Sequence, residues 1–144
     1  MDFLKINKNN IYIFAIKIAE RASSYIDDSE TVEIINESLE VCKKWTQEGG
    51  NVGESLYDYL DNEENGFTIF QEMEESERVI NAWDCIIDAI AYISKAAYEK
   101  EGVEYLPEPI ELVDDSILSH MIQALILCDD KEQEYIEKLY SELS

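Results

Sequence analysis

The longest run of helical periodicity in the sequence lies between Ser76 and Glu101. Apolar residues recur there at spacings of three and four, which places them on one side of an α-helix: Val79, Trp83, Ile86, Ile87, Ile90 and Ile93. Further apolar residues flank this stripe: Cys85, Ala89, Tyr92 and Ala96. Apolar side chains therefore cover much of the helix circumference, and Gly102 is placed to end the helix. We expect a long central helix that packs on more than one side.

The same spacing predicts shorter helices before and after this one. The second begins at Asp28 or Ser29, either of which can cap it, and it ends before Gly49. Only "GFTIF" has strand-like content, and a lone strand has no partner. Helical stripes are found in residues 11–22, 32–45, 54–60, 116–128 and 129–143. The sequence predicts an all-α, single-domain bundle of about five or six helices across residues 1–144.

Length, apolar content and cysteine usage indicate a globular cytoplasmic protein. The chain has 144 residues with 46% hydrophobic content, enough for the core of one domain. No stretch approaches the apolar length of a membrane span, and "MDFLKINKNN" lacks the features of a signal peptide. Cys42, Cys85 and Cys128 are odd in number and far apart, so we interpret them as buried thiols.

The charge is strongly negative and unevenly distributed. The chain has 33 acidic and 11 basic residues, a net charge of -22. Residues 1–48 contain 9 acids and 6 bases, residues 49–96 contain 11 and 2, and residues 97–144 contain 13 and 3. Such a field repels nucleic acid and anionic membranes, and it speeds the approach of a basic protein. Solubility alone also explains a high acid content.

One stretch, "DNEENGFTIFQE" from Asp61 to Glu72, is close to the calcium-binding loop of an EF-hand. The pattern needs oxygen ligands at alternate early positions, a glycine at the sixth and a glutamate at the twelfth. Glu63 is one methylene too long for its position, and no second loop of this kind is present. The candidate metal ligands are Asp61, Glu63, Asn65 and Glu72. We favour a solvated turn between two helices.

The sequence has no set of residues typical of an enzyme site or a bound cofactor. His120 is the only histidine, and Ser116 precedes it by one helical turn, a spacing that is common by chance. We expect His120 at the edge of the core or within it. Asp84 and Asp88 lie one turn apart without a Glu-x-x-His motif, so we expect them on a solvated face of the central helix.

Two groups of acids are the candidate partner-binding residues. The first acidic cluster spans twenty residues with no base, and its members are Asp58, Asp61, Glu63, Glu64, Glu72, Glu74, Glu75 and Glu77. The second acidic cluster follows the central helix and contains Glu108, Glu111, Asp114 and Asp115. Like charges at this density repel one another unless a basic partner relieves them. We expect contacts at Glu63, Glu64, Glu72, Glu74, Glu75 and the second acidic cluster.

The order of several segments resembles the Imm6 family of bacterial immunity proteins. The segments are "VCKKW", "SLYDYLD", "AWDCIIDAIAYISKAAY" and "LPEPIELVDDS", and the resemblance runs from about Ile11 to the final helix. The residues that carry the resemblance are chiefly Trp45, Leu56, Tyr57, Trp83, Tyr98 and Pro107. The resemblance implies an all-α protein, encoded beside a polymorphic toxin, that neutralises the toxic domain. It implies no catalytic residue and no particular contact residue.

The charge and the resemblance support the same leading hypothesis. A toxin that cleaves nucleic acid must present a basic surface to phosphate, and an acidic helical protein can occupy that surface. Two alternatives remain open at this point: a calcium-binding helical module that uses residues 61–72, and a general nucleic-acid mimic that acts on host proteins. The expected partner is a basic protein domain rather than nucleic acid or membrane.

Overall fold

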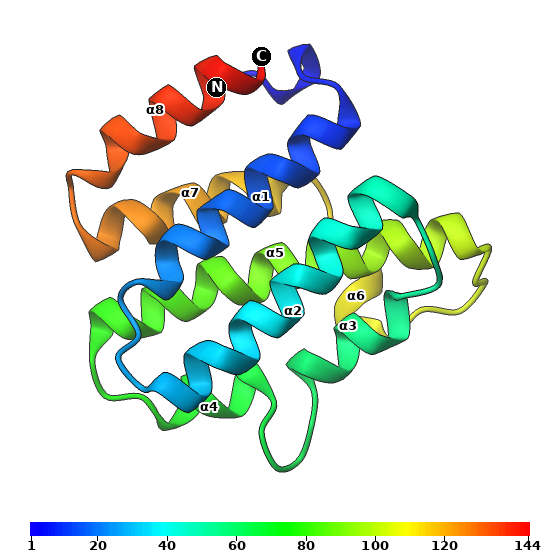
Figure 1. Ribbon diagram of the computed structural model, residues 1–144, viewed down its shortest axis with the longest axis horizontal. Coiled ribbons are helices and arrows are strands. Elements are labelled where there is room, and N and C mark those ends of the chain that lie inside the picture. Colours follow the sequence, from blue (N-terminus) through cyan, green and yellow to red (C-terminus); the bar gives the residue numbers. More distant parts are fainter.

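The computed structural model describes residues 1–144 and contains eight α-helices, one short 3-10 turn and no strand (Figure 1). The 3-10 turn is η1 (Phe3–Lys5). The helices are α1 (Lys8–Ser23), α2 (Ser29–Glu48), α3 (Gly53–Leu60), α4 (Phe67–Met73), α5 (Glu77–Glu101), α6 (Glu108–Glu111), α7 (Ser116–Cys128) and α8 (Glu132–Leu143). The all-α prediction is confirmed.

Helix α5 is the long central helix that the sequence predicts. It packs against α1, α2, α3, α4, α6 and α7, and Figure 1 shows it crossing the middle of the molecule. The Ser76 side chain accepts a hydrogen bond from the Val79 amide at its start. At its end Gly102 adopts a left-handed conformation with φ of 76°, which a residue without a Cβ adopts at little cost.

The longer helices α1, α2, α7 and α8 are arranged around α5 as follows. Helices α1 and α2 pack on each other and on α5, and α7 lies along another side of α5. Helix α8 lies at the outer edge against α1 and α7, close to the N-terminal segment (Figure 1). The Tyr140 hydroxyl donates to the Asp2 carbonyl oxygen at 2.9 Å, and this contact joins the two ends of the chain.

The predicted number of helices, about five or six, is wrong because two short helices are present as well. Helix α4 forms from the strand-like "GFTIF" segment, because Phe67 and Phe70 at a spacing of three both pack on Trp83. Helix α6 forms in the proline-containing segment. Pro109 lies in its first turn, where the amide that proline lacks has no helical partner.

The core is one cluster of 37 buried residues. Trp45 and Trp83 are 3% and 2% exposed, as their positions on the apolar stripes predict. Cys42, Cys85 and Cys128 are buried free thiols, which confirms that interpretation as well. No helix has both the length and the apolar content that crossing a membrane requires.

Candidate partner-binding surface

The first acidic cluster lies on α3, on the turn that follows, on α4, on the connection to α5 and at the first residue of α5. All of its members are exposed except Glu74, which is half-buried. The carboxylate of Glu74 accepts hydrogen bonds from the Glu75 and Ser76 amides and so shapes the start of α5. None of the five salt bridges in the structure involves this cluster. Asp61 also accepts a hydrogen bond from the Tyr57 hydroxyl, but no charge of the cluster has an oppositely charged partner within the chain.

The EF-hand-like segment forms a closed turn followed by a helix. The Gly66 amide donates to the Asn62 carbonyl, and the Thr68 hydroxyl donates to the Leu60 carbonyl at 2.9 Å. Gly66 is needed because an added Cβ would lie 2.6 Å from the Asn62 backbone nitrogen. The carboxylates of Asp61, Glu63 and Glu72 do not gather as a group of metal-binding side chains. The structure therefore accounts for the glycine of this motif without an ion.

The second acidic cluster lies on α6 and on the link to α7. Its four members are exposed. Two of its members have partners within the chain. Asp114 accepts hydrogen bonds from the Ser116 amide and hydroxyl, and these bonds hold the pKa of Asp114 below its usual value. Asp115 forms an ion pair with Lys8, whose nitrogen is 3.6 Å from its carboxylate. Two of the four acids therefore interact with other residues of the chain.

The two clusters pack against different parts of α5. The Gln71 amide donates to Asp84, which holds α4 against the first half of α5. The Lys95 ammonium donates to the Glu111 and Val113 carbonyls, which holds α6 and the segment after it against the second half. Asp84 and Lys95 are separated by roughly 16 Å along a helix that rises 1.5 Å per residue. The clusters are therefore two separate candidate contact regions.

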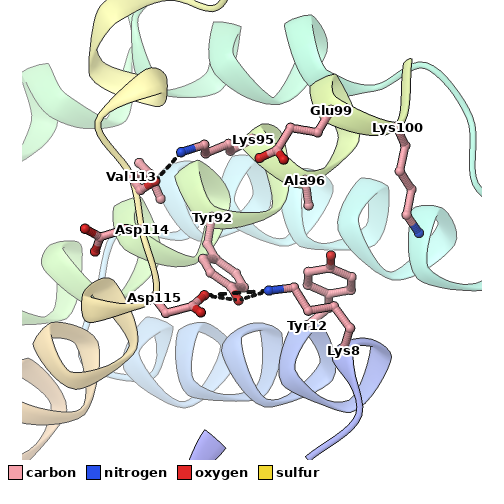
Figure 2. A pocket seen from close by; sticks show the side chains of 10 residues that line it. All are labelled: Lys8, Tyr12, Tyr92, Lys95, Ala96, Glu99, Lys100, Val113, Asp114 and Asp115. Atoms are coloured by element: carbon pink, nitrogen blue, oxygen red, sulfur yellow. Dashed lines mark hydrogen bonds and ion pairs between the residues drawn. The ribbon is translucent and has the colours of Figure 1, made fainter. Parts of the chain in front are cut away.

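A hollow of about 450 Å³ opens between the start of α1, the second half of α5 and the α6–α7 link (Figure 2). One hydrogen-bonded chain crosses it. The Lys8 ammonium donates to the Tyr92 hydroxyl at 3.1 Å, and that hydroxyl donates to Asp115 at 3.0 Å. The lining residues are Lys8, Tyr12, Tyr92, Lys95, Ala96, Glu99, Lys100, Val113, Asp114 and Asp115. Part of the second acidic cluster therefore forms one wall of this hollow.

The rings of Tyr12 and Tyr92 line the hollow, and Trp45 packs behind Tyr12. Tyr12 is 5% exposed and meets Trp45 edge-on, with 5.1 Å between ring centroids. The Lys8 and Lys100 ammonium groups each lie 6.0 Å from the centroid of the Tyr12 ring, and Lys100 lies 4.8 Å from that of Trp45. Burial raises the pKa of Tyr12, although the Lys8 charge opposes it, and burial also raises the pKa of Tyr92. Both hydroxyls therefore keep their protons at neutral pH.

The expected positions of His120 and Asp88 are corrected by the structure. His120 is a surface residue with a side chain that is 58% exposed, whereas the Asp88 side chain is only 13% exposed. The two are joined by a 2.5 Å contact between His120 Nδ1 and Asp88 Oδ2. Burial raises the pKa of Asp88 to about 6 against the opposing effect of His120. The Ser116 hydroxyl donates to Asp114, whereas His120 contacts Asp88, so the two side chains have different partners.

The sequence model of the family described as Immunity protein Imm6 matches residues 10–128 of the 144. The chain belongs to the Imm6 immunity protein family. No curated protein and no solved structure gave a match. The Imm6 match begins inside α1 and ends with α7, so α8 and the N-terminal segment lie beyond it. Four of the residues that carry the resemblance are buried, in keeping with a packing role: Trp45, Leu56, Trp83 and Tyr98.

In this Imm6 protein the hollow is the feature that the sequence did not reveal. Lys8 and Tyr12 lie one turn apart on α1, and they meet Lys100 only through the packing of α1 on α5. The charge pattern indicates acidic residues as candidates for binding, because bases are few and scattered. Tyr92 flanks the apolar stripe of the central helix, which predicts burial, and burial alone gives no signal of a hollow.

Proposed function

We propose that this protein inhibits its cognate toxin in the cytoplasm by binding, without catalysis, and that its acidic surface covers a basic face of the toxin. Family membership supports toxin immunity as the role. The buried free thiols suit a reducing compartment. A nuclease is the toxin class that best fits the charge, because a nuclease must present cationic groups to phosphate.

The single observation that carries this proposal is the state of the first acidic cluster. Its eight carboxylates are close together in the chain, seven are exposed, and none forms an ion pair. Acids held this way keep their mutual repulsion in the free protein. A basic partner relieves that repulsion when it binds, and the same field accelerates its approach.

The proposal is tested with the toxin domain encoded beside this chain. The toxin is expressed in bacterial cells with native protein, with no immunity protein, or with a variant of the first acidic cluster. We expect the native protein to protect the cells and to co-purify with the toxin. Growth arrest despite native protein, or no complex between the purified proteins, would contradict the proposed function.

A general nucleic-acid mimic shares the charge argument and differs in its target. Such a mimic binds several basic host proteins with similar affinity, because its binding depends mainly on charge. Competition between the purified toxin domain and an excess of host nucleoid proteins separates the two. We expect the toxin complex to persist, whereas displacement by the host proteins would favour the mimic.

A further inference from the structure

The hollow in Figure 2 contains two hydrogen-bond donors that have no acceptor within the chain. The Tyr12 ring is buried, and its hydroxyl points into the hollow, where it reaches solvent and makes no hydrogen bond within the chain. The Lys100 ammonium lies over the Tyr12 and Trp45 rings and takes part in none of the five salt bridges. The other two lysines are used within the fold, since Lys8 contacts Asp115 and Lys95 contacts backbone carbonyls.

An acceptor with negative charge fits these two donors better than a cation does. A protonated tyrosine hydroxyl and an ammonium both donate to a carboxylate, and a hydrogen bond with a charged partner is stronger than a neutral one. Glu99 also lines the hollow, but Figure 2 shows its carboxylate turned toward Lys95 and away from Lys100. The Lys100 side of the hollow is therefore cationic on a protein whose net charge is -22.

We propose that this hollow receives an aspartate or glutamate side chain of the toxin, whose carboxylate accepts hydrogen bonds from the Tyr12 hydroxyl and the Lys100 ammonium. The inference rests on the proposed function and adds a basis for specificity to it. Exposed acids attract any basic protein, whereas a hollow that demands a carboxylate at one position rejects basic proteins that lack it. Burying the carboxylate without these donors would leave it unpaired at a high cost.

The test measures equilibrium binding of the neighbouring toxin domain to native protein and to Lys100→Gln. This change makes the chain more acidic, so general electrostatic attraction predicts equal or tighter binding to a basic toxin. The hollow predicts the opposite: a loss of about 10-fold or more, because the carboxylate loses a charged donor. Lys44→Gln is the matched control, since Lys44 is exposed and in no salt bridge, and it should bind as native or slightly tighter.

Two further variants separate a lost donor from a damaged fold. Tyr12→Phe removes only the hydroxyl and should weaken binding by about 3–10-fold, while Tyr105→Phe at an exposed tyrosine should have no effect. Lys100→Arg keeps the charge and should restore most of the affinity. All variants should melt within a few degrees of the native protein, since none of these changes removes a hydrogen bond of the fold.

The outcomes distinguish this inference from the function on which it rests. If native protein binds the toxin and Lys100→Gln behaves like Lys44→Gln, the hollow receives no carboxylate and the proposed function stands. If native protein does not bind the toxin at all, both proposals fail. Support for the inference requires that Lys100→Gln weaken binding and that replacing one particular acid of the toxin with Ala remove the difference between native protein and Lys100→Gln.

Discussion

The two acidic clusters differ in what holds them. In the second acidic cluster, Asp114 is bonded by Ser116, and Asp115 by Tyr92 and Lys8. In the first acidic cluster Asp61 accepts a hydrogen bond from Tyr57 and Glu74 accepts two from backbone amides, but no member forms an ion pair. The second cluster therefore has an ion pair within the fold, whereas no charge of the first cluster has an oppositely charged partner.

This difference teaches that acid content in the sequence does not by itself identify a binding surface. A paired acid is costly to replace, because its donors lose their acceptor. An unpaired, exposed acid is cheap to replace and can even be destabilising, because neighbouring charges repel it. Measurements of the stability of variants can therefore test the difference between the two clusters without any toxin.

The largest expected effect comes from removing the support of the helix that carries part of the first acidic cluster. Trp83 packs against Phe67 and Phe70 of α4, with ring centroids 5.3 Å and 5.7 Å away. Trp83→Ala should reduce the free energy of unfolding by about 3–5 kcal/mol, as large core truncations do. Urea unfolding measures it. Native-like stability of this variant would show that α4 does not depend on this contact.

The next effect concerns Asp88, an acid of α5 that contacts His120 of α7. The pKa of Asp88 is raised to about 6, and that of His120 is raised by its hydrogen bond to Asp88. Both groups bind protons more tightly in the folded state, so the stability that they contribute is lost as pH rises through these pKa values. Between about pH 5 and pH 8 the native protein should lose about 1–2 kcal/mol more than Asp88→Asn loses.

Thermal and urea unfolding of both proteins at the two pH values provide the comparison. The isosteric Asn keeps a polar contact to His120 and removes the titrating carboxyl. Equal losses in the two proteins would show that the Asp88–His120 contact is not coupled to folding.

A smaller effect is expected at the Lys8–Tyr92–Asp115 hydrogen-bonded chain that crosses the hollow. Tyr92→Phe removes the hydroxyl that links Lys8 to Asp115, so it should cost about 1 kcal/mol. Tyr105→Phe, at a tyrosine that is 85% exposed, is the control and should leave stability unchanged. If the two variants are equally stable, the second acidic cluster is no better held than the first, and the comparison fails.

Much of the fold follows from the sequence because long periodic segments have clear ends. The predicted central helix from Ser76 to Glu101 differs from α5 by one residue at its start, since Ser76 caps and Gly102 terminates. Short segments are harder. The segment with Phe67 and Phe70 has the composition of a strand. It forms a helix because both rings contact Trp83, which lies further along the chain.

The candidate site was less predictable because charge in the sequence says nothing about pairing. The exposure of Glu63, Glu64, Glu72 and Glu75 follows from their polarity, whereas the separation of the two clusters along α5 depends on how α4 and α6 pack. His120 lies in a mostly apolar segment, and its contact with Asp88 places it at the surface. Such pairings join residues across helices, and no local pattern contains them.

The central claim is that the first acidic cluster binds a basic toxin face, and association kinetics test it most directly. The variant reverses four exposed acids that make no side-chain hydrogen bond and spares Glu74, which shapes a turn. It carries Glu63→Lys, Glu64→Lys, Glu72→Lys and Glu75→Lys. A control with the same change in net charge reverses four exposed acids elsewhere: Glu33→Lys, Glu48→Lys, Glu134→Lys and Glu142→Lys.

The association rate with the neighbouring toxin domain is measured for the native protein and both variants at low and at physiological salt. We expect the native rate to fall about 10-fold or more as salt rises, because electrostatic steering is screened. At low salt the cluster variant should associate about 10–100-fold more slowly than the control variant, which carries the same net charge. A native rate that ignores salt, or equal rates for the two variants, would contradict the account.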